Sequence, residues 1–404
     1  MPENTKSNAL KAIVVVCIAL MGTLVAAEVG IRLVEKAGLY PELFKLLGNA
    51  RPPLDRKDGP GMYYAHPYSA YALKPGYTRS GFERINSLGF RGEDISLEKP
   101  DDVYRIVAVG GSTTFAVYLP WNQSYPYLLQ EELRRRFNDD RIEVINAGLT
   151  GSTAAESFHR MATQILPLDP DMVVIYHAFN DLFPRMFNDY SEDYYHFRRN
   201  DPNNPPGMTR SYLYRLALRA LSPGFFHENN NQQQQVWKIE NLPATDTERS
   251  INFINSSNHA FKFHMDNIVK LIKANGGEAV LATFAMNSRT YNWTEHIPPY
   301  LWEVGIAENN EAIKEIAMEN DVPVVPFAEA PFPEASKRFQ VKLFPDSIHM
   351  APEGNQLKAE IFADVIAPII AKQLGVPVPE PSRYKTVPLS LTEESPLNAA
   401  PQAQ

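Results

Sequence analysis

From Tyr104 onward, short apolar runs alternate with segments of amphipathic helical pattern. The five apolar runs read YRIVAVGG, IEVINAGL, DMVVIYHAFN, EAVLATFA and VPVVPF. Strands of a parallel sheet are buried on both faces, so they read as continuous apolar stretches, and right-handed crossovers place the connecting helices over both faces. The pattern therefore predicts an α/β fold, a three-layer α/β/α sandwich built on a five-stranded parallel sheet.

The N-terminus carries a second strong pattern. Residues Ala12–Ala27 are uncharged, and a helical pattern continues beyond them through VGIRLVEK. A hydrocarbon core of about 30 Å needs a helix of about 20 residues, which this longer segment supplies. We favour a single N-terminal transmembrane helix acting as a signal-anchor, with the rest of the chain periplasmic or at the cell surface. A signal peptide cleaved after Val25-Ala26-Ala27 and a buried helix of a soluble domain are the alternatives.

These patterns divide the chain into four parts. Residues 1–36 are the expected cytoplasmic stub and signal-anchor helix, and residues 37–103 are a connector with a small leader segment. Residues 104–375 form the sandwich domain, which contains an insertion at 183–256. An insertion of this length after a sheet strand is typical of a lid, a binding element or disorder. We expect the proline-rich tail, 376–404, to be disordered.

Charge and cysteine content exclude some classes of function. The formal net charge is −8 and the isoelectric point is about 5.7. Nucleic-acid binding needs clustered Lys and Arg to contact phosphates, so we expect no nucleic-acid partner. Cys17 is the only cysteine in the sequence, which rules out an intramolecular disulfide and a metal site built from several cysteines.

Polar residues follow the predicted strands at the end where open α/β sheets bind ligands. The first strand ends in Gly110-Gly111-Ser112-Thr113, the second in Asn146-Ala147-Gly148 and the third in Phe179-Asn180-Asp181, while FPDSIHMAPEG precedes the last helix. Taken singly, each piece has an ordinary interpretation as a turn or a helix cap. A phosphate-binding loop is disfavoured, because no Lys follows the glycines at the spacing such a loop requires.

In combination these residues suggest nucleophilic catalysis. A serine nucleophile needs a base within hydrogen-bond reach, and the base needs a group that orients it. Ser112 would be the nucleophile, with His349 as base and Asp346 as the orienting carboxylate. Donors for a developing oxyanion would be the backbone N–H groups of Ser112 and Gly148 and the side-chain amide of Asn180.

The same residues give the chain a resemblance to the SGNH (GDSL-type) hydrolases, in particular to membrane-anchored bacterial members. Ser112 in GGST, Gly148 in NAGLTG, Asn180 in AFND and the pair Asp346 and His349 in DSIH match the four sequence blocks of that family in order. The resemblance covers residues 104–375. It implies a flavodoxin-like sheet of order 2-1-3-4-5, the roles given above for these five residues, and neither a cofactor nor a metal.

The sequence departs from the family pattern at two positions. Gly111 stands where the family has an acidic residue, and Ala178 stands where it has the first glycine of GxND. Because the residue before the serine is not part of the triad, we expect activity to survive the first change. The second change, alanine at position 178, affects the turn that directs the Asn180 side chain.

The leader segment INSLGFRGEDI also resembles that of anchored members, and we expect Arg91 to hold it to the sandwich through a salt bridge.

These observations predict an SGNH-type serine esterase that cleaves an acyl ester through an acyl-serine intermediate. The substrate would be a cell-envelope carbohydrate or lipid ester, between which the sequence does not decide. One alternative is an acyltransferase that passes the acyl group to an envelope polysaccharide, and another is a non-catalytic scaffold with the same fold.

Two further side chains, His177 and Trp302, are more readily interpreted as core packing than as parts of a binding site.

Overall fold

The computed structural model describes residues 3–39, 62–66, 69–79, 81–198, 211–213, 237, 241–287, 299–330 and 343–382. Close contacts divide the chain into two compact units. The first consists of Met1–Ala72 and Phe197–Glu240, and the second of Leu73–His196 and Asn241–Gln404. Much of the leader segment thus belongs to the same unit as the predicted sandwich. Most of the predicted proline-rich tail, from residue 383 on, lies outside the described residues.

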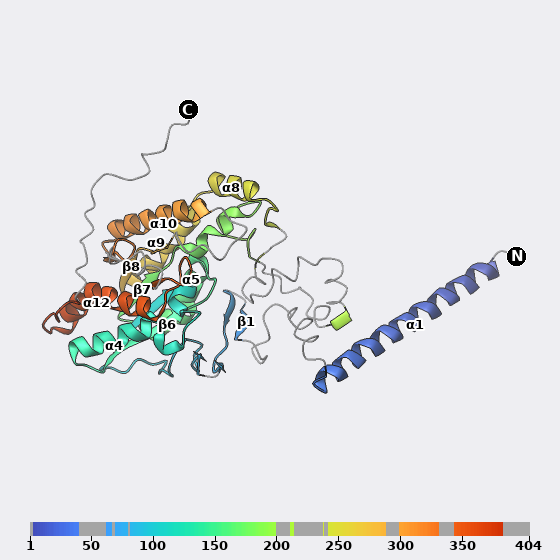
Figure 1. The fold of residues 1–404 in the computed structure, drawn as a ribbon, viewed down its shortest axis with the longest axis horizontal. Helices are drawn as coiled ribbons and strands as arrows, with labels where there is room; N and C mark the ends of the chain where they lie inside the picture. Colours follow the sequence, from blue (N-terminus) through green and yellow to red (C-terminus); the bar gives the residue numbers. More distant parts are fainter. Residues whose placement is uncertain are drawn as a thin grey trace, which may run out of the picture. The chain divides into compact units, whose positions relative to one another are not determined.

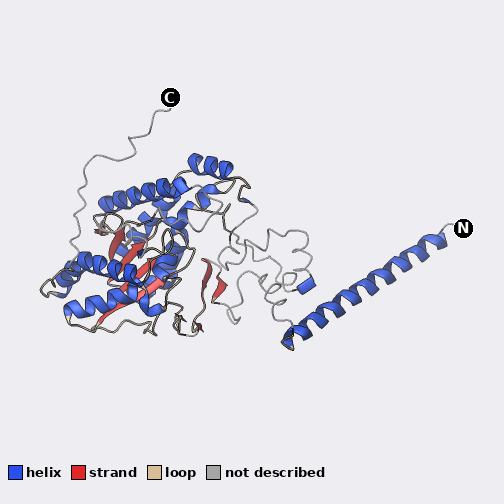
Figure 2. Ribbon diagram, viewed as in Figure 1, coloured by secondary structure: helices blue, strands red, loops and turns tan. Residues whose placement is uncertain are grey.

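The second unit is built on one parallel sheet (Figures 1 and 2). Its strands are β5 (Tyr104–Gly110), β6 (Ile142–Gly148), β7 (Met172–Tyr176), β8 (Glu278–Ala282) and β9 (Val324–Val325), in the order β6-β5-β7-β8-β9. Every neighbouring pair is parallel. Numbered along the chain, this order is 2-1-3-4-5, so the predicted sheet is confirmed.

Helices cover both faces of this sheet. On one face lie α4 (Tyr125–Phe137) and α12 (Pro352–Leu374), and on the other lie α5 (Ala154–Arg160) and α9 (His259–Ala274). A further helix, α10 (Pro299–Asn320), contributes residues to both hydrophobic clusters. Alternate residues of each strand enter opposite clusters, because successive side chains of a strand point to opposite faces. The predicted three-layer sandwich is therefore confirmed.

Shorter elements occur in both units. They are β1 (Tyr63–His66), β2 (Ala70–Leu73), the hairpin of β3 (Thr78–Arg79) and β4 (Glu83–Arg84), α3 (Ser112–Phe115), α8 (Asp246–Asn255), and the helical turns η1 (Trp121–Gln123), η2 (Met161–Ile165), η3 (Leu166–Leu168), η4 (Phe179–Leu182) and η5 (Pro184–Met186). Two of them, α3 and η4, directly follow strands β5 and β7. They present polar residues at the carboxyl edge of the sheet.

In the first unit, the N-terminal helix α1 runs over Glu3–Lys36. Its segment Val14–Val34 has a mean hydropathy of 2.4 and is long and apolar enough to cross a membrane. The prediction of one N-terminal apolar helix is confirmed, and the helix can serve as an anchor or as a signal sequence. Near its end, the Glu28 carboxylate accepts hydrogen bonds from the Ser211 hydroxyl at 3.0 Å and from the Leu213 N–H at 3.1 Å.

Candidate active site

Ser112 lies just after β5, an inner strand of the sheet, where the chain turns into a helix. Strand β5 ends at Gly110, and the four-residue helix α3 begins with Ser112. A side-chain carbon on Gly111 would lie 2.5 Å from Nδ2 of Asn180, so glycine lets that amide approach the backbone in its observed position. The tight turn explains why the GGS sequence occurs here. As the first residue of α3, Ser112 has a backbone N–H without an acceptor inside the helix.

The Ser112 hydroxyl faces a histidine that comes from the far end of the chain. Nε2 of His349 lies 2.8 Å from Oγ of Ser112, and Nδ1 of His349 lies 2.8 Å from Oδ2 of Asp346. The other carboxylate oxygen, Oδ1 of Asp346, accepts the backbone N–H groups of Ile348 and His349 at 2.9 and 2.7 Å. The three predicted triad residues are thus joined in one chain of hydrogen bonds.

The environment of Asp346 favours its ionised form. Burial alone would raise the pKa of this carboxyl group, but the hydrogen bonds and charge of His349, together with the backbone N–H bonds, lower the pKa below its usual value. An ionised carboxylate can only accept hydrogen bonds, so Nδ1 of His349, which faces it, carries the hydrogen and acts as the donor. Nε2 is then left to accept the proton of the Ser112 hydroxyl.

Asn180 lies in η4, directly after β7. Its side-chain amide donates one hydrogen bond to the Ser152 carbonyl at 2.8 Å. An amide nitrogen carries two hydrogens, so a second donor remains for a ligand. The following residue, Asp181, accepts the N–H of Ala154 at 3.0 Å, which ties η4 to the start of α5. The part of Ser152 in holding the Asn180 side chain could not be seen in the sequence, because the acceptor is its backbone carbonyl.

Gly148 is the third of the predicted oxyanion donors. Its N–H donates to Oδ1 of Asn146 at 3.0 Å, and a side-chain carbon at this glycine would lie 2.3 Å from the backbone nitrogen of Phe115. Gly148 therefore lets β6 approach the back of α3, and its N–H already has an acceptor. Glycine at this position thus permits the close packing, and its part as an oxyanion donor stays a prediction.

Ala178, the other departure from the family pattern, fits its turn without strain. Its φ is −172°, which is extended backbone open to any residue. Its carbonyl accepts the side-chain amide of the buried Asn309 at 2.9 Å. The turn that aims Asn180 is thus held by α10, so alanine at this position does not disturb the site.

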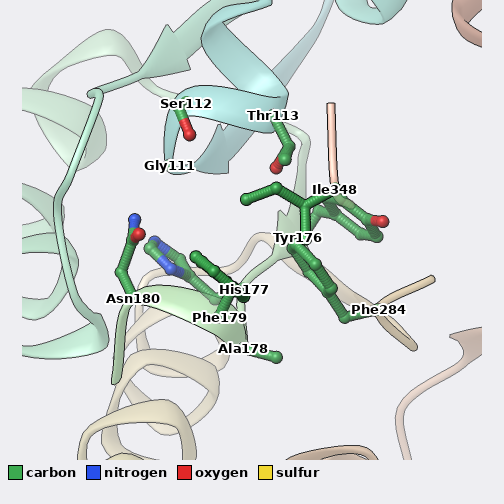
Figure 3. A pocket seen from close by; sticks show the side chains of 10 residues that line it. All are labelled: Gly111, Ser112, Thr113, Tyr176, His177, Ala178, Phe179, Asn180, Phe284 and Ile348. Atoms are coloured by element: carbon green, nitrogen blue, oxygen red, sulfur yellow. The ribbon is translucent and has the colours of Figure 1, made fainter. Parts of the chain in front are cut away.

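A small pocket opens beside Ser112, with about 200 Å³ of empty space that includes open solvent. It is lined by Gly111, Ser112, Thr113, Tyr176, His177, Ala178, Phe179, Asn180, Phe284 and Ile348. Figure 3 shows the Ser112 hydroxyl and the Asn180 amide toward one side of this space, and the rings of Tyr176 and Phe284 toward the other. The pocket therefore combines polar groups that suit a carbonyl with an aromatic wall.

Two aromatic side chains lie where packing was expected. His177 is buried, and its Nε2 lies 2.7 Å from Oγ of Ser157. Burial lowers the pKa of His177 to about 4, with a smaller lowering from Arg160. Trp302 is also buried and stacks on Phe179 at 4.5 Å between ring centroids. Both are packing residues in this structure, although His177 is also among the residues that line the pocket.

Tyr118 was not identified from the sequence. Its ring packs edge-on against His349 at 5.0 Å between ring centroids, and about half of its surface is exposed. Burial and the charge of Asp346 raise the pKa of the Tyr118 hydroxyl. An exposed tyrosine six residues after the serine carries no motif of its own, so only the fold reveals its place beside the base.

Comparison with known proteins gives a match at the level of the family. Residues 108–357, more than half of the chain, match the family model of the GDSL-like lipase/acylhydrolase family. No protein of curated function matches the sequence.

Solved structures with similar folds include esterases and related hydrolases. A G-D-S-L family protein from Desulfitobacterium hafniense is 18% identical, with 65% of this chain and 99% of that chain covered at a TM-score of 0.39. An acetylxylan esterase from Geobacillus stearothermophilus is 13% identical, with 70% and 100% covered at a TM-score of 0.41. An α/β hydrolase from the metagenome of Lake Arreo is 14% identical, with 64% and 93% covered at a TM-score of 0.40.

Proposed function

Because the chain belongs to the GDSL-like lipase/acylhydrolase family and is therefore an ester-hydrolysing enzyme, we propose that it cleaves esters of short acyl groups through an acyl-serine intermediate on Ser112. The observation that carries this proposal is the continuous hydrogen-bonded chain from Ser112 through His349 to Asp346. It has the geometry that a serine nucleophile, its base and an orienting carboxylate require.

The reaction proceeds in two halves. Nε2 of His349 takes the proton of the Ser112 hydroxyl as Oγ attacks the ester carbonyl carbon, and the same nitrogen then protonates the departing alcohol. The oxyanion of the tetrahedral intermediate is held by the backbone N–H of Ser112 and by the free hydrogen of the Asn180 amide. In the second half His349 activates a water molecule, which releases the acid and restores Ser112.

The aromatic wall of the pocket favours a small acyl group, such as acetyl. Tyr176 and Phe284 stack with ring centroids 4.6 Å apart, and the Tyr176 hydroxyl accepts the N–H of Ala285 at 3.2 Å. Both rings are buried, so they stand as a fixed barrier at the end of the pocket. A long acyl chain would have to displace them, which costs packing energy.

The enzyme acts outside the cytoplasm in this proposal. The apolar helix α1 anchors it, and its substrate is an ester of the cell envelope, either a carbohydrate or a lipid. Protease treatment of intact spheroplasts tests the orientation, because the catalytic unit should be digested while the cytoplasmic compartment stays sealed. Complete protection of the catalytic unit would contradict this placement.

The test of the activity uses the full chain in detergent with p-nitrophenyl acetate, butyrate and octanoate. Ser112→Ala and His349→Ala should each abolish nearly all turnover. The matched controls Ser124→Ala and His159→Ala should retain it, because Ser124 bonds to the carbonyl of Trp121 and His159 is exposed on α5. Equal activity in Ser112→Ala and wild type would contradict the assignment.

The acyl-length proposal has its own variant. Phe284→Ala removes one ring of the wall and should raise the ratio of octanoate to acetate hydrolysis, because the pocket gains length. An unchanged ratio would show that this pocket does not hold the acyl group. Labelling of Ser112 by a fluorophosphonate probe without turnover of any ester would instead favour acyl transfer to an acceptor other than water.

A further inference from the structure

The leader segment folds into a compact turn in the catalytic unit, close to the nucleophile. The buried side chain of Asn86 organises this turn, because its Oδ1 accepts the N–H groups of Leu88 and Phe90 at 3.1 and 2.9 Å and its Nδ2 donates to the Glu93 carbonyl at 3.0 Å. Gly89 completes the turn with a φ of +86°, which glycine adopts without strain. The turn delivers the next residue but one, Arg91, to the edge of the sheet.

The backbone of Arg91 extends the sheet beyond its edge strand. Its N–H donates to the Asn146 carbonyl at 3.1 Å, which makes an antiparallel bridge to β6. The side-chain amide of Asn146 in turn donates to the carbonyl of Thr114 in α3 at 3.0 Å. The leader is therefore linked to the nucleophile helix through a single residue of β6.

The guanidinium of Arg91 reaches the same helix directly. It donates to the carbonyl of Phe115, to that of Ala116 at 2.7 Å and to that of Leu119 at 2.5 Å. It also lies over the Phe115 ring, 4.1 Å from the centroid, and the side chain is buried. These partners are backbone carbonyls at the end of α3 and in the loop after it, so Arg91 does hold the leader to the sandwich.

Those carbonyls belong to the segment that fixes the geometry of the site. The helix α3 has only four residues, so the group that holds its last carbonyls also sets the direction of Ser112 at its start. Ala116 and Leu119 flank Tyr118, whose ring packs against His349. A cation at the carboxyl end of a helix also complements the partial charge of the unpaired carbonyls there.

We propose that Arg91 is a positioning residue, through which the leader segment sets the distance between the Ser112 hydroxyl and the His349 base. The inference rests on the proposed function, because it concerns the same nucleophile and base. Arg91 touches neither reacting group. It acts through α3 on the nucleophile and through the loop at Tyr118 on the base.

Arg105 supplies a matched control, because it is a second buried arginine bonded to carbonyls of the leader. It donates to the carbonyls of Ser96 and Leu168 at 3.0 and 2.8 Å and to the Glu143 carboxylate at 2.6 Å. Arg105 is the second residue of β5, at the end of the strand far from Ser112. Lysine at either position retains a charge but cannot reproduce the fork of guanidinium donors.

The experiment compares Arg91→Lys with Arg105→Lys in the full chain in detergent. For each we would measure Tm, kcat and KM for p-nitrophenyl acetate, and the rate of Ser112 labelling by a fluorophosphonate, all per folded molecule. Arg91→Lys should lower both kcat and the labelling rate by about ten- to a hundredfold, with little change in KM, because a misplacement of about 1 Å costs that much. Arg105→Lys should lower Tm while kcat stays within about twofold of wild type.

A double-mutant cycle with Tyr118→Ala separates positioning from general loss of stability. If Arg91 acts partly through the loop at Tyr118, the effects of Arg91→Lys and Tyr118→Ala on kcat should be less than additive. Equal losses of kcat in Arg91→Lys and Arg105→Lys, or full activity in Arg91→Lys, would overturn the inference alone. Failure of the wild type to label at Ser112 would overturn the proposed function and this inference with it.

Discussion

The two ends of the central sheet hold similar polar residues in different arrangements. At the amino end, Arg105 bonds to Glu143 and to backbone carbonyls, while Asp171 accepts both the Arg105 N–H at 2.7 Å and the Lys99 ammonium at 2.8 Å. At the carboxyl end, Ser112 bonds to His349 and Asn180 bonds to Ser152, but the backbone N–H of Ser112 and the second amide hydrogen of Asn180 can still be directed to a ligand in the pocket. Charges at the first end pair with one another and with the backbone, whereas donors at the second end remain available to a ligand.

This difference shows what distinguishes a site from a structural cluster. Both ends are largely buried and both contain a carboxylate held by backbone N–H groups. Only the carboxyl end has glycines that let polar side chains approach the backbone, as Gly111 does for Asn180. The end where we propose catalysis is therefore marked by a pocket beside donors that can still bind a ligand, and not by the number of charged groups.

The largest expected effect comes from the orienting carboxylate. Asp346→Asn should lower kcat for p-nitrophenyl acetate by about a thousandfold or more, because a neutral amide no longer holds Nδ1 of His349 as a donor. The variant keeps the shape of the side chain, so its Tm should fall only modestly. A kcat within tenfold of wild type, measured on folded protein, would show that the ends of the sheet do not differ in the way described.

The oxyanion donor should have the next largest effect. Asn180→Ala removes the side-chain amide beside Gly111 and should lower kcat by about a hundred- to a thousandfold, with KM changing much less. Steady-state kinetics of the folded variant measure both constants. A near-normal rate would show that the AFND segment does not supply the oxyanion donor.

A pH-dependent effect on stability follows from His177, which lies at the carboxyl end but outside the triad. Its pKa falls to about 4 in the folded state, against about 6.5 when unfolded, so the unfolded chain binds more protons between these values. Stability should therefore decline as the pH falls from about 6.5 to 4, by on the order of 3 kcal/mol in total from this residue. Denaturant unfolding of His177→Gln should show a shallower decline, and an equally steep one would contradict the assignment.

The smallest effect is expected at the amino end. Asp171→Ala removes the acceptor shared by Lys99 and the Arg105 N–H and should lower the free energy of unfolding by about 1–2 kcal/mol. The kcat of the folded variant should equal that of wild type. A large loss of kcat in Asp171→Ala would mean that the amino end of the sheet influences ester hydrolysis.

The sequence carried enough information to predict the sheet, and to predict that Ser112, Asp346 and His349 lie together, because both leave side-chain patterns. Buried strands are continuous apolar runs, and Asp346 and His349 stand three residues apart on one turn. The two-residue strand β9 was foreseen from its apolar run, although not its short length. These features depend on residue type and spacing, which a sequence displays directly.

The features that escaped prediction depend on backbone groups. Arg91 bonds to carbonyls, which every residue has, so its partners leave no trace in the sequence. The bond from the Gly148 N–H to Asn146 likewise follows from the path of the chain after β6. Tyr118 reaches His349 because α3 ends after one turn, and the sequence has no pattern from which this short helix length could be predicted.

If α1 anchors the chain in a membrane, as we propose, the contacts of Glu28 bear on how the enzyme could be released. The chain passes between the two units three times, after residues 72, 196 and 240. A protease cut after residue 72 would sever the direct path from α1 to the catalytic unit. Ser211 and Leu213 would still bond to Glu28, and the catalytic unit is covalently continuous with that segment. Under the proposed anchoring, this segment would be a second link between α1 and the catalytic unit after a single cut.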